Sequence, residues 1–75
     1  MKPLVEYIAR NLVDDPDAVN VVQREAGRTT ILKLSVAPDD KGKVIGKDGR
    51  VAKAIRVLLQ VTATRQRRRA ILQIS

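Results

Sequence analysis

The chain has 75 residues and carries fifteen Lys and Arg against eight Asp and Glu, so its formal net charge is +7. It contains no cysteine and no histidine, which excludes a disulfide framework, a thiolate nucleophile, an imidazole base and the usual zinc site. Tyr7 is the only aromatic residue, which argues against recognition of bases by stacking on exposed rings. The basic excess favours nucleic acid or another polyanion as partner.

These features also set the broad class of protein. A chain of this length without a low-complexity stretch is expected to form one small domain over residues 1–75, with a thin aliphatic core. No apolar run approaches membrane-spanning length, so we expect a cytoplasmic protein without membrane insertion. We expect no cofactor, no metal and no enzymatic activity, because acidic side chains are the only plausible metal-binding or catalytic groups in the sequence.

The first helix is expected over residues 3–13. Pro3 suits the first helical turn, and Glu6 is placed to pair with Arg10 one turn later. Apolar residues recur at helical spacing, at Leu4, Val5, Ile8, Leu12 and Val13. The segment Asp14-Asp15-Pro16-Asp17 then stops the helix, because proline cannot continue the backbone ladder.

A β-hairpin follows, with strands expected over residues 18–26 and 29–36. In the second strand, strict alternation turns Leu32 toward the helices and Lys33 away from them. The first strand alternates imperfectly around Val21-Val22, which indicates either a bulge or a half-exposed edge.

Two helices and a strand complete the pattern. A short helix ends near Ile45, a long helix spans about residues 49–64, and a third strand is expected over 70–75. The second and third strands are separated by more than thirty residues of helical crossover, so they can pair in parallel. The fold class is therefore α+β, in the order α-β-β-α-α-β, with a three-stranded mixed sheet and helices on one face.

Several acidic residues stand at the boundaries between elements. Asp39 or Asp40 can cap the short helix, and Asp48 can cap the long one. A metal-dependent nuclease would have to use the acids that flank the two prolines, namely Asp14, Asp15, Asp17, Asp39 and Asp40. Capping and turn formation explain these residues without catalysis.

The turn between the two later helices carries the candidate chemistry. Gly46 and Gly49 allow a ligand to approach the backbone closely, and the N–H groups at the start of the long helix converge on the same place. Four cations surround the turn, namely Lys43, Lys47, Arg50 and Lys53. A phosphate group is the expected ligand, although a pair of glycines at this spacing is equally compatible with a purely structural turn.

The long helix shows more than one apolar face at about 100° per residue. Its expected core face consists of Val51, Ile55, Leu58, Leu59 and Thr62. A further strip, Ala54, Val57 and Val61, lies beside the polar face that holds Lys53 and Arg56. Two interpretations remain open for this strip, a partner surface or a contact with the first helix.

The segment Arg65-Gln66-Arg67-Arg68-Arg69 carries four positive charges between the long helix and the last strand. It can serve as a phosphate-contacting patch or as a solvated connection.

The run Val44-Ile45-Gly46-Lys47-Asp48-Gly49, between a short helix and a longer one, resembles the signature of the KH domain. The order of elements is similar to the type II form of that fold. The run from Val36 to Arg50, with an N-terminal helix that ends in Val13-Asp14-Asp15-Pro16, resembles the small bacterial single-KH proteins of the KhpA family. The resemblance covers nearly the whole chain.

This resemblance implies a single-stranded RNA-binding protein that clamps about four nucleotides, acting as an RNA chaperone or post-transcriptional regulator. The implied RNA-binding residues are Lys43, Ile45, Gly46, Lys47, Asp48, Gly49, Arg50, Ala52 and Lys53. It also implies self-association and a larger KH-containing partner, with a role in cell-envelope growth or cell shape. The alternative is a protein-interaction adaptor with a weak or vestigial RNA site.

Ala52 departs from the KH pattern, which usually has a large aliphatic residue three positions after the second glycine. A smaller side chain there either widens the nucleic-acid groove or leaves a gap that Val51 and Ile55 fill.

Overall fold

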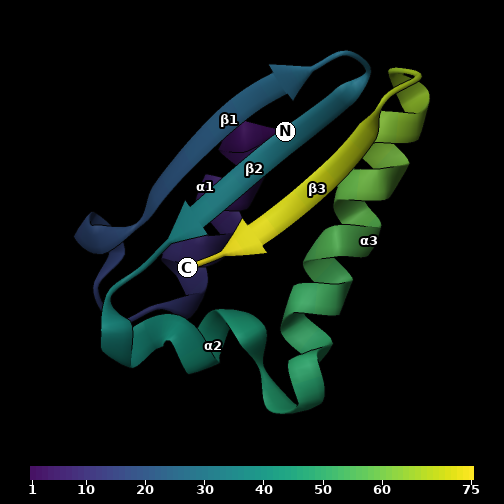
Figure 1. Cartoon of the computed structure of the whole chain (residues 1–75). Coiled ribbons are helices and arrows are strands. Elements are labelled where there is room, and N and C mark those ends of the chain that lie inside the picture. Colours follow the sequence, from purple (N-terminus) through teal and green to yellow (C-terminus); the bar gives the residue numbers. More distant parts are fainter.

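The computed structural model describes residues 1–75 (Figure 1). Its helices and strands are α1 (Lys2–Leu12), β1 (Asn20–Ala26), β2 (Thr29–Ser35), α2 (Lys41–Ile45), α3 (Arg50–Arg65) and β3 (Arg69–Ile74). Short 3₁₀ turns occupy Pro16–Ala18, Pro38–Asp40 and Lys47–Gly49. None of these helices combines the length and the apolar character that crossing a membrane requires.

The predicted order α-β-β-α-α-β is confirmed, and most boundaries agree within one residue. The largest shift is at the start of β1, which begins at Asn20 because Pro16–Ala18 forms a 3₁₀ turn. Pro16 stands at the first position of that turn, where its fixed φ suits a helical conformation and its missing N–H is not needed.

The three strands lie in the order β1-β2-β3. The β1–β2 pair is antiparallel and runs without interruption from Asn20 opposite Ser35 to Ala26 opposite Thr29. The irregular Val21-Val22 pattern therefore belongs to an edge strand and not to a bulge. The β2–β3 pair is parallel, which confirms the mixed sheet expected from the long crossover.

One face of the sheet packs against the helices and forms the core. On β2 the buried residues alternate at Thr30, Leu32 and Leu34, while Lys33 is exposed as predicted. On β3 the buried residues are Ala70 and Leu72. The helices contribute aliphatic side chains to the same cluster, namely Val5, Ala9, Val44, Ile55, Leu59 and Ala63. In Figure 1, α1 lies behind the sheet and α3 runs beside β3.

The core face of α3 differs from the predicted one. Its buried residues are Ala52, Ile55, Leu59 and Ala63. Leu58 is 49% exposed, so its assignment to the core was wrong, and Thr62 is only half-buried. The buried stripe begins and ends with alanine, of which only Ala63 belongs to the main core cluster. The side-chain amide of Gln60 donates a hydrogen bond to the Ala70 carbonyl on β3 (2.6 Å). The buried stripe thus lies along a different side of the helix from the one that the larger apolar residues indicate.

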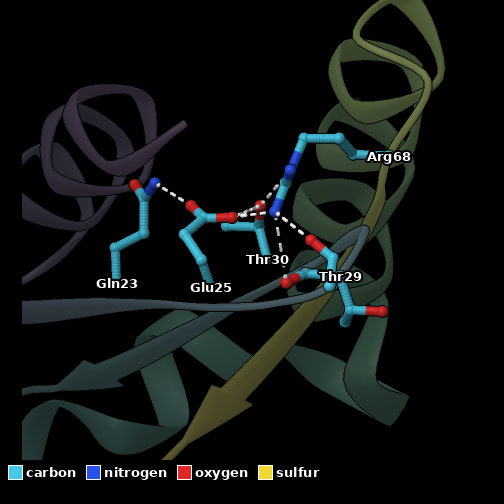
Figure 2. A network of polar contacts seen from close by, with 6 residues as sticks. Gln23, Glu25, Thr29, Thr30 and Arg68 are labelled. Atoms are coloured by element: carbon cyan, nitrogen blue, oxygen red, sulfur yellow. Dashed lines mark hydrogen bonds and ion pairs between the residues drawn. The ribbon is translucent and has the colours of Figure 1, made fainter.

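A polar network fixes the start of β3 against the hairpin (Figure 2). Arg68 Nε donates to the hydroxyl of the buried Thr30 (3.0 Å), which in turn donates to Glu25 (2.9 Å). The guanidinium also pairs with Glu25 and donates to the carbonyls of Gly27 (3.3 Å) and Thr29 (3.4 Å). Hydrogen bonds from Gln23 and Thr30, together with the Arg68 charge, hold the pKa of Glu25 below its usual value. Arg68 is therefore a structural residue within the arginine segment.

Candidate nucleic-acid interface

The loop between α2 and α3 begins with a glycine that no other residue can replace without strain. Gly46 has φ of +77°, in the left-handed region that side chains disfavour. A Cβ built at this position would lie 2.4 Å from Cγ2 of Val51 and 2.9 Å from its backbone nitrogen. The close approach of this backbone to the first turn of α3 sets where the loop sits.

The second glycine of the loop has a different environment. Gly49 also has positive φ (+74°), but a Cβ there would meet no atom within 4 Å. The space above Gly49 is thus open to a ligand that approaches the backbone. Gly46 is thus packed against α3, whereas Gly49 faces open space.

Asp48 does not cap α3, contrary to the sequence prediction. It lies inside the loop with φ of +56° and ψ of +23°, and Gly49 takes the N-cap position without any side-chain hydrogen bond. A left-handed conformation is tolerated by aspartate better than by most residues. The start of α3 therefore has no side chain covering its first N–H groups.

Three predicted cations surround the open side of the loop. Lys47, Arg50 and Lys53 are exposed, and none of them takes part in an ion pair. Ile45 ends α2 with a side chain that is 39% exposed, so an apolar surface adjoins these charges. Ala52 is only 3% exposed, and its methyl group belongs to the buried stripe of α3.

Lys43 differs from the other three cations because it is already paired with acids. Its ammonium pairs with Asp14 and lies 3.4 Å from Oδ1 of Asp40. The hydrogen bond with Asp14, together with the charges of both acids, raises the pKa of Lys43. The structure thus gives this residue a role at the start of α2, where it joins that helix to the segment after α1.

Asp40 is the centre of that junction. Its buried carboxylate accepts hydrogen bonds from the backbone N–H groups of Asp14 (3.2 Å) and Asp15 (3.1 Å). Asp40 occupies the N-cap position of α2, one of the two positions predicted for the cap, but its side chain makes no capping hydrogen bond there. Burial acts to raise the pKa of Asp40, but the two N–H donors and Lys43 outweigh it and hold the pKa below its ordinary value.

A second surface lies on the outer side of α3. Val57 and Val61 are 62% and 51% exposed, and Ala54 is exposed with them. The exposed Leu58 extends this strip, so its members recur at intervals of three and four residues along one side of the helix. The first helix does not cover the strip, because its members stay exposed even though Leu4 of α1 lines a pocket together with Leu58 and Val61. The interpretation of the strip as an α1 contact was therefore wrong.

Comparison with known proteins agrees with this architecture. A family model described as the KhpA/KhpB KH domain matches residues 2–74. The chain belongs to this family. The type II arrangement and the KhpA-like resemblance drawn from the sequence are thereby confirmed.

The chain is similar over almost its full length to KhpA proteins of several bacteria. It is 54% identical to the RNA-binding protein KhpA of Halalkalibacterium halodurans, covering 99% of this chain and 97% of that protein. It is 49% identical to the RNA-binding protein KhpA of Clostridium acetobutylicum, covering 99% of both chains. The KhpA of Aquifex aeolicus is 40% identical, covering 99% of this chain and 94% of that protein. No solved structure matches the chain.

Some residues that shape this KhpA-family site carry no recognisable sequence signal. The Asp40 junction joins segments 25 and 26 residues apart in the sequence, and nothing local marks Asp40 apart from Asp39. The contact of Val51 with Gly46 depends equally on the angle between α2 and α3. The buried stripe of α3 did have a signal, because Ala52, Ile55, Leu59 and Ala63 follow helical spacing.

Replacement of the two loop glycines by alanine should separate their roles. We expect Gly46→Ala to lower the free energy of unfolding by about 2–5 kcal/mol, because positive φ and displacement of Val51 both oppose it. Gly49→Ala should cost about 1–2 kcal/mol, from the positive φ alone. Urea unfolding followed by circular dichroism measures both values. Equal losses of unfolding free energy in the two variants would contradict the assignment of Gly46 as packed and Gly49 as open.

The Asp40 junction should make stability depend on pH in the acidic range. The folded pKa of Asp40 lies below its ordinary value of 3.8, so its contribution is complete above that value and is lost as the pH falls through the folded pKa. We expect the melting temperature of the wild type to fall in this range, and Asp40→Asn to reduce the pH dependence. Asp39→Asn, at the exposed neighbour, is the matched control. An Asp40→Asn variant that keeps the full decline would show that other acids cause it.

Proposed function

We propose that this protein binds single-stranded RNA and holds about four nucleotides against the Gly46–Gly49 loop. The observation that carries this proposal is the open left-handed backbone at Gly49, with three exposed and unpaired cations beside it. The names of the three KhpA relatives, each called an RNA-binding protein, support it.

The loop geometry suits a sugar-phosphate backbone. The missing side chain at Gly49 lets a phosphate come close to the main chain, and the uncapped start of α3 supplies N–H donors. Lys47, Arg50 and Lys53 add positive charge, whereas Asp48 opposes the ligand and limits its affinity. Ile45 offers an apolar surface for a base or ribose. Without aromatic stacking, binding by one loop is expected to be weak and tolerant of sequence.

The acidic residues favour binding over catalysis as the function of this fold. Asp40 accepts two backbone hydrogen bonds, Asp14 pairs with Lys43, and Glu25 pairs with Arg68. Carboxylates that hold elements together in this way are engaged in structure rather than directed at a substrate. Of the five acids that the nuclease alternative would use, Asp14 and Asp40 are engaged in this way, and no three acidic side chains are grouped closely enough to hold a metal ion.

In the cell we propose an RNA chaperone or post-transcriptional regulator, working in the cytoplasm with a larger KH-containing partner in control of the cell envelope or cell shape. A weak clamp of this kind gains from assembly, because linking two clamps turns the second binding event into an intramolecular one. This part of the proposal rests on the resemblance to the KhpA family.

The second candidate function is that of an interaction module, and the exposed strip of α3 favours it. Ala54, Val57, Leu58 and Val61 form a continuous apolar side on a helix whose other side is already buried. Such a surface on a small basic protein fits a hydrophobic partner helix or a second copy of the chain. In an adaptor, this strip would carry the function and the RNA loop would be vestigial.

The loop assignment predicts a loss of RNA affinity when its lysine is reversed in charge. Lys47→Asp should weaken binding of a short single-stranded RNA by about tenfold or more, because a charge-assisted contact is replaced by repulsion. The melting temperature should change little, since Lys47 is exposed. Fluorescence anisotropy measures the affinity. Lys2→Asp, at another exposed lysine, is the matched control, and equal affinity in the two variants would remove the loop from the site.

The strip assignment predicts a change in assembly. Val61→Glu should abolish self-association or partner binding, because burial of an unpaired carboxylate in an apolar contact is unfavourable. Val22→Glu makes the same replacement at a comparably exposed valine of β1 and should leave assembly unchanged. Analytical ultracentrifugation distinguishes the two. If Val61→Glu loses its partner while the wild type shows no RNA binding, the adaptor is the correct function.

A further inference from the structure

The face of the sheet that points away from the helices has an unusual composition. Residues directly opposite one another on paired strands share a face. Arg24 lies opposite Ile31, and Ile31 lies opposite Ile71. Val22 lies opposite Lys33 in the next row of the same face. Figure 1 looks onto this face, with α1 behind the sheet.

Three cations surround the centre of this outer face. Arg24, Lys33 and Arg69 stand on the three different strands, and strand spacing places their Cα atoms roughly 8–14 Å apart. All three are exposed, and none takes part in an ion pair. No aspartate or glutamate occurs at any position that the register assigns to this face.

The middle of the same face is apolar. Val22 and Ile71 are 40% and 46% exposed, and Ile31 between their strands is half-buried. The hairpin and the parallel pair thus present a flat aliphatic area bordered by positive charges. The structure also divides the arginine segment here. Arg68 turns inward to Glu25, while Arg69 one residue later joins the outer face.

We propose that the outer face of the sheet is a second binding site for single-stranded RNA, in which Arg24, Lys33 and Arg69 contact phosphates and the aliphatic centre contacts bases or riboses. The inference rests on the proposed function, because it assumes the same ligand, single-stranded RNA. It uses none of the loop residues. The site engages RNA too long to be held by the loop alone.

Charge decides between RNA and the other possible occupants. A second copy of this chain would bring the same three cations against each other across a symmetric contact, and like charges repel. A protein partner would need acidic residues opposite the three cations and an apolar surface opposite the aliphatic centre of the sheet. An RNA strand supplies regularly spaced phosphates with apolar base and sugar surfaces between them, which matches the arrangement on the sheet.

The two RNA sites would lie on one continuous path. The Gly46–Gly49 loop leads into α3, and α3 runs beside β3, whose other side pairs with β2 (Figure 1). The loop lies at the start of α3 and Arg69 follows its end, so an RNA strand that reaches both must run the length of this 16-residue helix, about 24 Å. Two contacts on one strand raise the affinity for long RNA far more than for short RNA, through effective concentration.

The test compares two RNA lengths with two sets of substitutions. The variant R24Q/K33Q/R69Q removes the three charges, and K2Q/R10Q/K41Q removes three exposed charges on α1 and α2 as the matched control. The probes are a tetranucleotide, the length of a single clamp, and a strand of about 16 nucleotides, near the upper site size of small single-strand binders. Affinity is measured by fluorescence anisotropy at several salt concentrations, and melting temperature verifies the fold.

We expect R24Q/K33Q/R69Q to weaken binding of the long strand about tenfold, as for three exposed ionic contacts, and to leave the tetranucleotide at the level of the control. The slope of log K against log salt for the long strand should become shallower by about 2. The same loss should persist when Lys47→Asp is also present. Measurements in the Lys47→Asp background tell the two proposals apart. If Lys47→Asp alone leaves the RNA affinity unchanged, the loop site is rejected, and the effect of R24Q/K33Q/R69Q still tests the sheet site.

Two outcomes would overturn the inference. Equal weakening of the long strand by the test and control variants would mean that only net charge matters. Unchanged RNA binding, with loss of binding to phosphatidylglycerol vesicles in R24Q/K33Q/R69Q alone, would assign the face to an anionic lipid surface instead.

Discussion

The contact between Gly46 and Val51 is the constraint on which the candidate interface depends. Because no Cβ fits between the two residues, the backbone of the loop lies directly against the first turn of α3. This contact sets the direction in which α3 leaves α2, and it turns Gly49 outward into open space. The same helix then runs beside β3, so the loop, the exposed strip and β3 keep fixed relative positions.

Two polar junctions connect the α2–α3–β3 part of the chain to the preceding elements. Asp40 joins the segment after α1 to the start of α2, and Arg68 joins the start of β3 to the hairpin. Both involve buried groups whose hydrogen bonds are satisfied within the protein, as burial requires. Each junction also pairs a cation that the sequence alone suggests as a ligand contact, Lys43 in the first and Arg68 in the second. Six other exposed cations are free of ion pairs and lie on the two candidate RNA surfaces, with Lys47, Arg50 and Lys53 at the loop and Arg24, Lys33 and Arg69 on the outer face of the sheet.

The helix α3 shows how one element can serve packing and surface recognition together. Its buried stripe consists of Ala52, Ile55, Leu59 and Ala63. The larger side chains Val57, Leu58 and Val61 are consequently left on the outside. A thin core in a small domain has little room for them, because the fraction of surface buried falls with chain length. The exposed apolar strip is thus a result of which side of the helix faces the core.

The sequence by itself determined the order of elements, the mixed sheet, the turn at Gly46–Gly49 and the absence of histidine and cysteine chemistry. These follow from local periodicity, from proline and glycine positions, and from composition, which do not depend on distant contacts. Only the tertiary structure decided that Asp40 and Arg68 are structural, that Asp48 caps nothing, and that Leu58 is outside the core. The roles of Asp40 and Arg68 depend on contacts across 25 to 43 residues of chain, and no local pattern records such contacts. The exposure of Leu58 depends on how α3 is turned toward the core, and Asp48 on the backbone conformation of the loop.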